Sequence, residues 1–100
     1  MVRIETNKKN NKYKKITFKD HANYAEFGKD IVCAAVSSTM LCTVNAIYLI
    51  NEDSINIAKN DNDFTIEVVN FNDITNKLLE NMMHCLESLE KQYAKNIKIK

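Results

Sequence analysis

The chain has 100 residues, of which 45% are hydrophobic, and its 14 basic residues nearly balance its 13 acidic ones. This length suits a single domain over residues 1–100, and the apolar content argues against intrinsic disorder. The three cysteines form no disulfide framework and no Cys-x-x-Cys pair. We therefore expect free thiols in a reducing compartment such as the cytoplasm, and neither a metal site nor another cofactor.

The charges are unevenly distributed along the chain. Residues 1–30 carry eight basic and four acidic side chains, whereas residues 31–50 carry none. A lysine-rich N-terminal third could contact the phosphates of a nucleic acid. Solvated lysines on an edge hairpin explain the same pattern, and aromatic and arginine side chains are sparse there. We favour solvated lysines and do not expect nucleic-acid contact.

The first elements read as a hairpin followed by a long loop. Val2, Ile4 and Thr6 alternate with polar residues, which predicts a half-buried strand, and residues 13–19 (YKKITFK) offer a second strand after an Asn- and Lys-rich turn. Periodicity then fails over residues 20–29. A loop of about ten residues is long for a compact domain and is often functional. It contains Gly28, the single glycine of the chain.

Residues 31–50 (IVCAAVSSTMLCTVNAIYLI) form an uncharged segment long enough to span a membrane. The segment contains several Ser, Thr and Asn residues, however, and neither an aromatic belt nor a basic flank frames it. Its polar groups do not gather on one helical face, as they would in a helix with one solvent side. We therefore expect a central buried helix, with a second subunit as one way of covering part of it, and no membrane contact.

The second half repeats the strand–strand–helix order. Residues 54–59 and 63–71 predict another hairpin, and an amphipathic helix follows over about 74–94, capped by Asn72 or Asp73. Residues 96–100 (NIKIK) close the chain as a strand. The order ββαββαβ predicts an α+β fold with both helices packed on one sheet. The expected apolar stripe of the second helix comprises Ile74, Leu78, Met82, Cys85, Leu89 and Tyr93.

The cysteines differ in position. Cys42 lies nine residues after Cys33, on the opposite side of the helix, and its apolar neighbours suggest a small core residue; Cys85 on the second stripe suggests the same. If Asp30 is the N-cap, Cys33 is among the first three helical residues. Free backbone N–H groups and the positive end of the helix dipole stabilise a thiolate there, although the charge of Asp30 opposes this.

Two further side chains could act with Cys33. A thiol nucleophile needs a base within hydrogen-bond reach, and a long loop could bring His21 to it. Ser37 follows Cys33 by one helical turn on the same face and could donate a hydrogen bond to the thiolate or to a substrate. The pattern alone leaves open a structural thiol, a surface histidine and a serine bonded to its own helix.

Residues 21–37 (HANYAEFGKDIVCAAVS) resemble the signature of the ribosomal-processing cysteine proteases of the Prp family. The shared features are a loop His followed by Ala, and then Gly-x-Asp-Ile-Val-Cys-Ala-Ala-x-Ser. The resemblance implies that Cys33 is the nucleophile and that His21 is its general base and later its general acid. It also implies that Asp30 supports the site, that Ser37 lines it, and that Gly28 belongs to it.

The same resemblance implies a biological role. Members of the family remove an N-terminal extension from large-subunit ribosomal protein twenty-seven, so a peptide substrate and a homodimer are expected here. One residue departs from the family pattern: Asp20 stands where the family has Gly before the histidine. This departure leaves an alternative, a catalytically impaired relative that binds ribosome-assembly partners.

Overall fold

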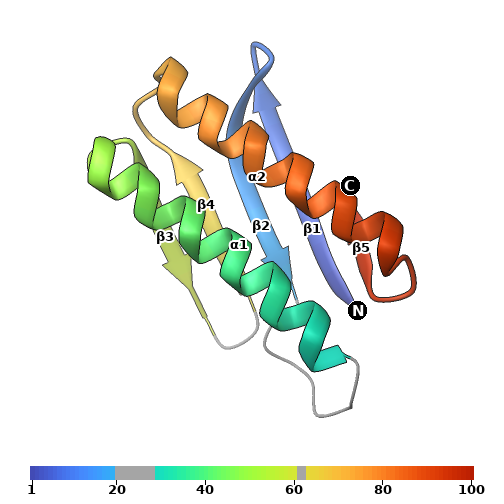
Figure 1. Ribbon diagram of the computed structural model, residues 1–100. Coiled ribbons are helices and arrows are strands. Elements are labelled where there is room, and N and C mark those ends of the chain that lie inside the picture. The colour runs from blue at the N-terminus through green and yellow to red at the C-terminus, as the bar shows by residue number, and fades with distance from the viewer. Residues whose placement is uncertain (20–28, 61–62) are drawn as a thin grey trace.

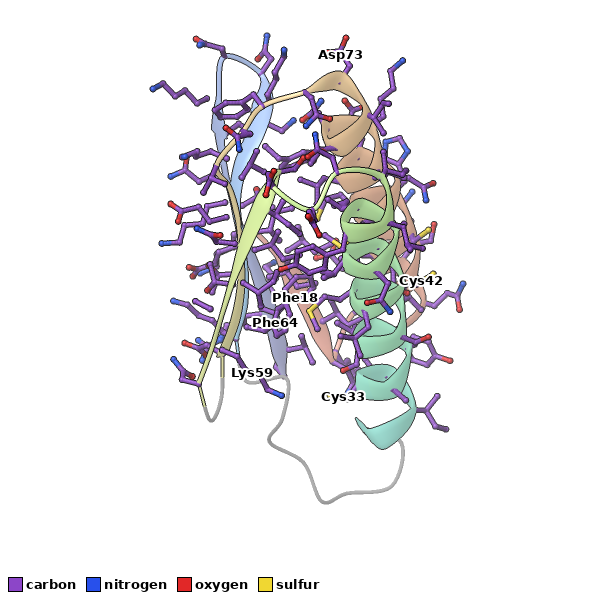
Figure 2. All side chains as sticks on the ribbon, turned by 90° about the vertical axis from the view of Figure 1, so that its left-hand side faces the viewer. Phe18, Cys33, Cys42, Lys59, Phe64 and Asp73 are labelled. Atoms are coloured by element: carbon purple, nitrogen blue, oxygen red, sulfur yellow. The ribbon has the colours of Figure 1, made fainter. Side chains whose placement is uncertain are left out.

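The computed structural model describes residues 1–19, 29–60 and 63–100. A mixed sheet with strand order β3-β4-β2-β1-β5 forms one layer, and helices α1 and α2 lie side by side over one of its faces (Figures 1 and 2). This confirms the predicted α+β class and the order ββαββαβ. The elements are β1 Val2–Lys9, β2 Lys12–Lys19, α1 Lys29–Ile50, β3 Ile55–Lys59, β4 Asp63–Val68, α2 Asp73–Gln92 and β5 Ile97–Ile99.

The two predicted hairpins meet in the middle of the sheet. Each hairpin is antiparallel, and β2 pairs antiparallel with β4, which aligns Ile16 with Ile66. The last strand, β5, pairs parallel with β1 and sets Ile97 beside Val2. A parallel neighbour requires a long crossover connection, and α2 belongs to the one that leads to β5. The central pair β2–β4 therefore carries most of the sheet's covered face.

A single apolar core fills the space between the sheet and the helices. On the strands every second side chain points inward, as the alternating sequence pattern predicts. Phe18 is fully buried and packs edge-on against Phe64, with ring centroids 6.5 Å apart and an interplanar angle of 77°. The helices contribute Val32, Val36, Met40, Val44 and Ile47 from α1, and Leu79, Met82, Met83 and Leu86 from α2.

Helix α1 begins at Lys29, so the prediction that Asp30 is its N-cap is wrong. The helix includes the charged residues Lys29 and Asp30, so it begins before the uncharged run that starts at residue 31. A first turn can be polar because its N–H groups remain open to solvent, and an acidic residue there is favoured by the helix dipole. Cys33 is consequently the fifth residue of the helix instead of one of the first three.

Within the part of the chain that the structure describes, one face of α1 is covered. Segment Ile31–Ile50 is long and apolar enough to cross a membrane, with a mean hydropathy of 1.7, but 39% of its apolar window is buried against the rest of the molecule. Its threonines bond to their own helix: Thr39 Oγ1 donates to the Ala35 carbonyl at 2.8 Å, and Thr43 Oγ1 to the Thr39 carbonyl at 2.9 Å. The expected burial thus holds for the face toward the sheet.

Asn72 caps helix α2, one of the two residues predicted for this role. Its Oδ1 accepts from the Thr75 N–H at 2.8 Å, and its Nδ2 donates to the Ser54 Oγ at 2.9 Å. Ser54 is fully buried at the start of β3. A single side chain therefore caps α2, satisfies a buried hydroxyl and joins two elements of the second half of the chain.

The buried stripe of α2 differs from the predicted one. Thr75, Leu79, Met82, Met83 and Leu86 are buried, whereas Ile74 is 53% exposed and Cys85 is also exposed. The buried positions follow i, i+4, i+7, i+8 and i+11, the spacing of one helical face. Adjacent apolar residues in α2 are compatible with two buried stripes, the predicted one through Ile74 and the observed one through Thr75. Packing on the sheet determines that the stripe through Thr75 is the buried one.

Candidate active site

Cys33 lies near the start of α1, on the side that faces the sheet (Figure 2). Its side chain is 5% exposed and belongs to the core cluster that also contains Val32 and Val36 from the same helix. These neighbours follow the helical period and hold the helix start against the sheet. The backbone fold therefore positions this thiol, and its rotamer space is limited by packing.

The other two cysteines are exposed, which contradicts the prediction that both are core residues. Cys42 does lie on the opposite side of α1 from Cys33, as the nine-residue spacing predicts. None of the described residues covers that side, so Cys42 lies at the surface. Cys85 is exposed because the buried stripe of α2 runs through Leu86 and Met82 instead. None of the three cysteines forms a disulfide bond.

Ser37 lies one helical turn beyond Cys33 and is half-buried. Four residues along a helix advance the chain by about 6 Å and return to nearly the same face. Ser37 therefore shares the sheet-facing side with Cys33, while Ala34 and Ser38 are exposed on the other side. The expected proximity of the serine and the thiol thus follows from the observed helix.

Sequence reasoning missed the residues from the sheet at this end of the molecule. Phe18 and Phe64 pair across β2 and β4, and both belong to the core cluster that includes Cys33. Lys59, at the end of β3, is aligned with Phe64 and lies at the same end of the molecule as Cys33 (Figure 2). The alternation of apolar residues along the strands could have identified Phe18 and Phe64 as inward-facing. Their packing against α1, however, depends on how the helices lie on the sheet.

The remaining candidates are not placed. His21 and Gly28, and also Asp20, lie outside the described residues. The backbone of Asp30 is in the first turn of α1, but its side chain lies outside the description too. The pairing of Cys33 with His21 therefore stays a prediction. Across residues 1–19, 29–60 and 63–100, no group of three His, Cys, Asp or Glu side chains could hold a metal ion.

The described residues around Cys33 are compatible with acyl-transfer chemistry. A thiol is held one turn inside a helix start, beside a half-buried hydroxyl and above an aromatic core. The N–H groups of the first turn of a helix have no partner within the helix, so they are suitable donors to a developing oxyanion. A thiol in such a position can act as a nucleophile once a base approaches its sulfur.

Comparison with known proteins assigns the family. The family model of cysteine protease Prp matches residues 1–98. The chain belongs to this family. A Prp relative, the ribosomal processing cysteine protease Prp of Staphylococcus aureus strain Mu50, is 35% identical over 82 residues, which cover 79% of this chain and 77% of the relative.

Two Prp crystal structures from S. aureus share the fold. The structure of an essential ribosomal processing protease Prp with a substrate peptide has a TM-score of 0.87 and 30% identity, and the match covers 99% of this chain and 95% of that one. The structure with a covalently linked product peptide has a TM-score of 0.88 and 29% identity, with 99% and 97% covered. The Prp fold is thus present along nearly the whole chain.

Proposed function

We propose that the protein is a cytoplasmic cysteine endopeptidase that removes the N-terminal extension of large-subunit ribosomal protein twenty-seven. The observation that carries the proposal is the position of Cys33 in this Prp chain. It is the buried cysteine at the start of α1, whereas Cys42 and Cys85 are exposed. A covalently linked product peptide in the S. aureus relative supports covalent chemistry, and three cysteines without a disulfide bond agree with a reducing compartment.

In the first half of the proposed reaction, the Cys33 thiolate attacks the scissile carbonyl carbon. The carbonyl oxygen takes the negative charge, and N–H groups of the first turn of α1 donate to it. When the tetrahedral intermediate collapses, the carbon–nitrogen bond breaks. The leaving amine takes a proton from the imidazolium of His21, and the extension remains on Cys33 as a thioester.

In the second half, water hydrolyses the thioester. His21 removes a proton from the attacking water, the carbon–sulfur bond breaks, and the extension leaves as a carboxylate. Asp30 would support the site from the first turn of α1. Ser37 would line it beside Cys33, and Gly28 would provide backbone freedom just before the helix.

Cleavage of the extended ribosomal precursor tests this function. The purified protein is incubated with the precursor and with the mature form that lacks the extension, and the products are identified by intact mass. We expect a single cut in the precursor and no change in the mature form. A precursor that binds but stays intact would contradict the proposal and favour the impaired, partner-binding relative suggested by Asp20 in the family glycine position.

We also propose that the protein is a homodimer that uses the outer side of α1. Over residues 31–50 this side carries no charged residue and has exposed apolar side chains, with Leu49 89% exposed. Exposed apolar patches of this extent are typical of interaction surfaces. We define the α1 outer stripe as Ile31, Ala34, Ser38, Leu41, Cys42, Asn45, Tyr48 and Leu49.

A charge in the middle of the α1 outer stripe is expected to separate the subunits. Sedimentation equilibrium should give about twice the 11.5 kDa chain mass for the wild type and one chain mass for Leu41→Asp, because a buried unpaired carboxylate is strongly unfavourable. The matched control is Ile74→Asp, at an exposed apolar residue of α2, which should remain dimeric. A dimeric Leu41→Asp or a monomeric wild type would contradict the proposed interface.

A further inference from the structure

The tip of the β1–β2 hairpin is rich in lysines and contains a β-bulge. Its turn consists of Asn10 and Asn11, with φ angles of 55° and 63°, the left-handed pair of a tight hairpin turn. The register shifts beside Asn7, which is opposite Lys15, while Lys8 is opposite Tyr13. Lys14 is therefore an extra residue in β2. Such a bulge bends the strand and increases its local twist.

Aromatic rings lie close to two of these lysines. Lys8 Nζ is 4.6 Å from the ring centroid of Tyr13, and Lys14 Nζ is 5.5 Å from that of Phe71. Lys14 Nζ also donates to the Val68 carbonyl at 2.9 Å, which fixes the position of this ammonium group. The ammonium groups of Lys8 and Lys14 thus lie against aromatic rings instead of extending into solvent.

Phe71 belongs to this cluster although it lies far away in the sequence. It comes from the connection between β4 and α2, and it is 44% exposed. Together with Lys9, Asn10 and Lys12, Phe71 lines a hollow of about 360 Å³. The sequence alone did not favour nucleic-acid contact because aromatic side chains are sparse near the lysines. The fold brings the aromatic ring of Phe71 next to these lysines.

The charge of this surface is predominantly positive. Lys8, Lys9, Lys12 and Lys14 surround the turn, and one carboxylate, Asp73, approaches Lys12 at 3.8 Å. Both partners of this pair are well exposed, so solvent weakens their attraction and Lys12 remains available to a stronger anion. The hollow therefore combines Lys9 and Lys12 with the partly exposed side chain of Phe71.

We propose that this surface, the hairpin tip with Phe71, binds single-stranded RNA. A base would stack on Phe71 within the hollow while Lys9 and Lys12 contact flanking phosphates, the combination that single-strand binders use. An acidic peptide would match the lysines but would leave the aromatic ring without a partner of its own. The hairpin tip lies at the opposite end of the molecule from the start of α1 (Figure 1). Bound RNA would therefore leave the candidate active site open.

This proposal goes beyond the proposed function, and RNA binding is measured without cleavage. Fluorescence anisotropy with a labelled oligouridylate should show saturable binding that weakens between about 50 and 200 mM salt. Phe71→Ala should weaken binding by about 5- to 100-fold, through loss of stacking. The double variant Lys9→Gln/Lys12→Gln should reduce the salt slope by about 1.4, because about 0.7 is lost per phosphate contact.

The matched control is Lys91→Gln/Lys95→Gln, which removes the same charge from exposed lysines at and just after the end of α2. Its affinity should equal that of the wild type, and all variants should cleave a short precursor peptide at the wild-type rate. The proposal fails if no binding saturates at low salt or if Phe71→Ala binds normally. It also fails if both lysine pairs weaken binding equally, or if polyglutamate displaces the RNA at the same charge concentration.

Discussion

Replacing Cys33 by alanine is expected to abolish precursor cleavage, with a rate lowered by about 10⁴-fold or more. The reason is that the covalent route disappears with the sulfur, and the remaining backbone donors and binding contacts cannot replace a nucleophile. Cys33 is 5% exposed, and alanine fits the same space with the loss of one atom. Folding should therefore be retained, which circular dichroism and thermal unfolding would verify.

The two exposed cysteines provide matched controls for this experiment. Cys42→Ala and Cys85→Ala remove the same sulfur atom from surface positions of α1 and α2. Both variants should cleave the precursor within about twofold of the wild-type rate, because Cys85 is exposed on α2 and alanine at position 42 keeps the α1 outer stripe small and uncharged. Undiminished cleavage by Cys33→Ala would contradict the assigned nucleophile, and a loss confined to Cys42→Ala would transfer that role to the outer side of α1.

Replacing Phe18 by alanine is expected to lower the free energy of unfolding by about 3–5 kcal/mol. Phe18 is fully buried, stacks edge-on against Phe64, and occupies the central strand β2 beneath both helices. Its removal leaves a cavity and forfeits the ring–ring contact. A loss of this size is a large fraction of the stability of a small domain, typically 5–15 kcal/mol.

Urea denaturation followed by circular dichroism measures this change, with Ile74→Ala as the control. Ile74 is 53% exposed on α2, so its truncation should change the free energy of unfolding by no more than about 0.5 kcal/mol. The two substitutions both remove apolar side chains, but they differ in burial. Similar losses for the two variants, or a loss below about 1.5 kcal/mol for Phe18→Ala, would contradict the described core.

The helices and strands could be predicted from local sequence patterns, whereas the buried face of each helix could not. Alternating apolar and polar residues predicted the strands, and the capping residue Asn72 predicted the start of α2. Both signals lie within a few residues of the element that they predict. The buried stripe of α2 depends on which of two apolar faces meets the sheet. That choice is made by packing between layers, so Ile74 and Cys85 were wrongly predicted to be buried.

The site shows the same division. The sequence predicts that Cys33 lies near the start of an uncharged helix. The helical period also predicts that Ser37 lies on the same face of that helix. The start of α1 at Lys29 was missed because its first turn is polar. The aromatic pair Phe18–Phe64 and the proximity of Phe71 to Lys14 arise from strand register and layer stacking, which bring distant segments together.

Rapid acid quenching followed by intact-mass and peptide-mapping mass spectrometry tests the central claim most directly. The protein is mixed with the extended ribosomal precursor and stopped while cleavage is in progress, when a thioester intermediate is present. The account predicts an adduct that adds the mass of the released extension less one water, carried by the peptide that contains Cys33. Cleavage with the adduct on Cys42 or Cys85, or cleavage by a chain in which Cys33 is alkylated, would contradict it.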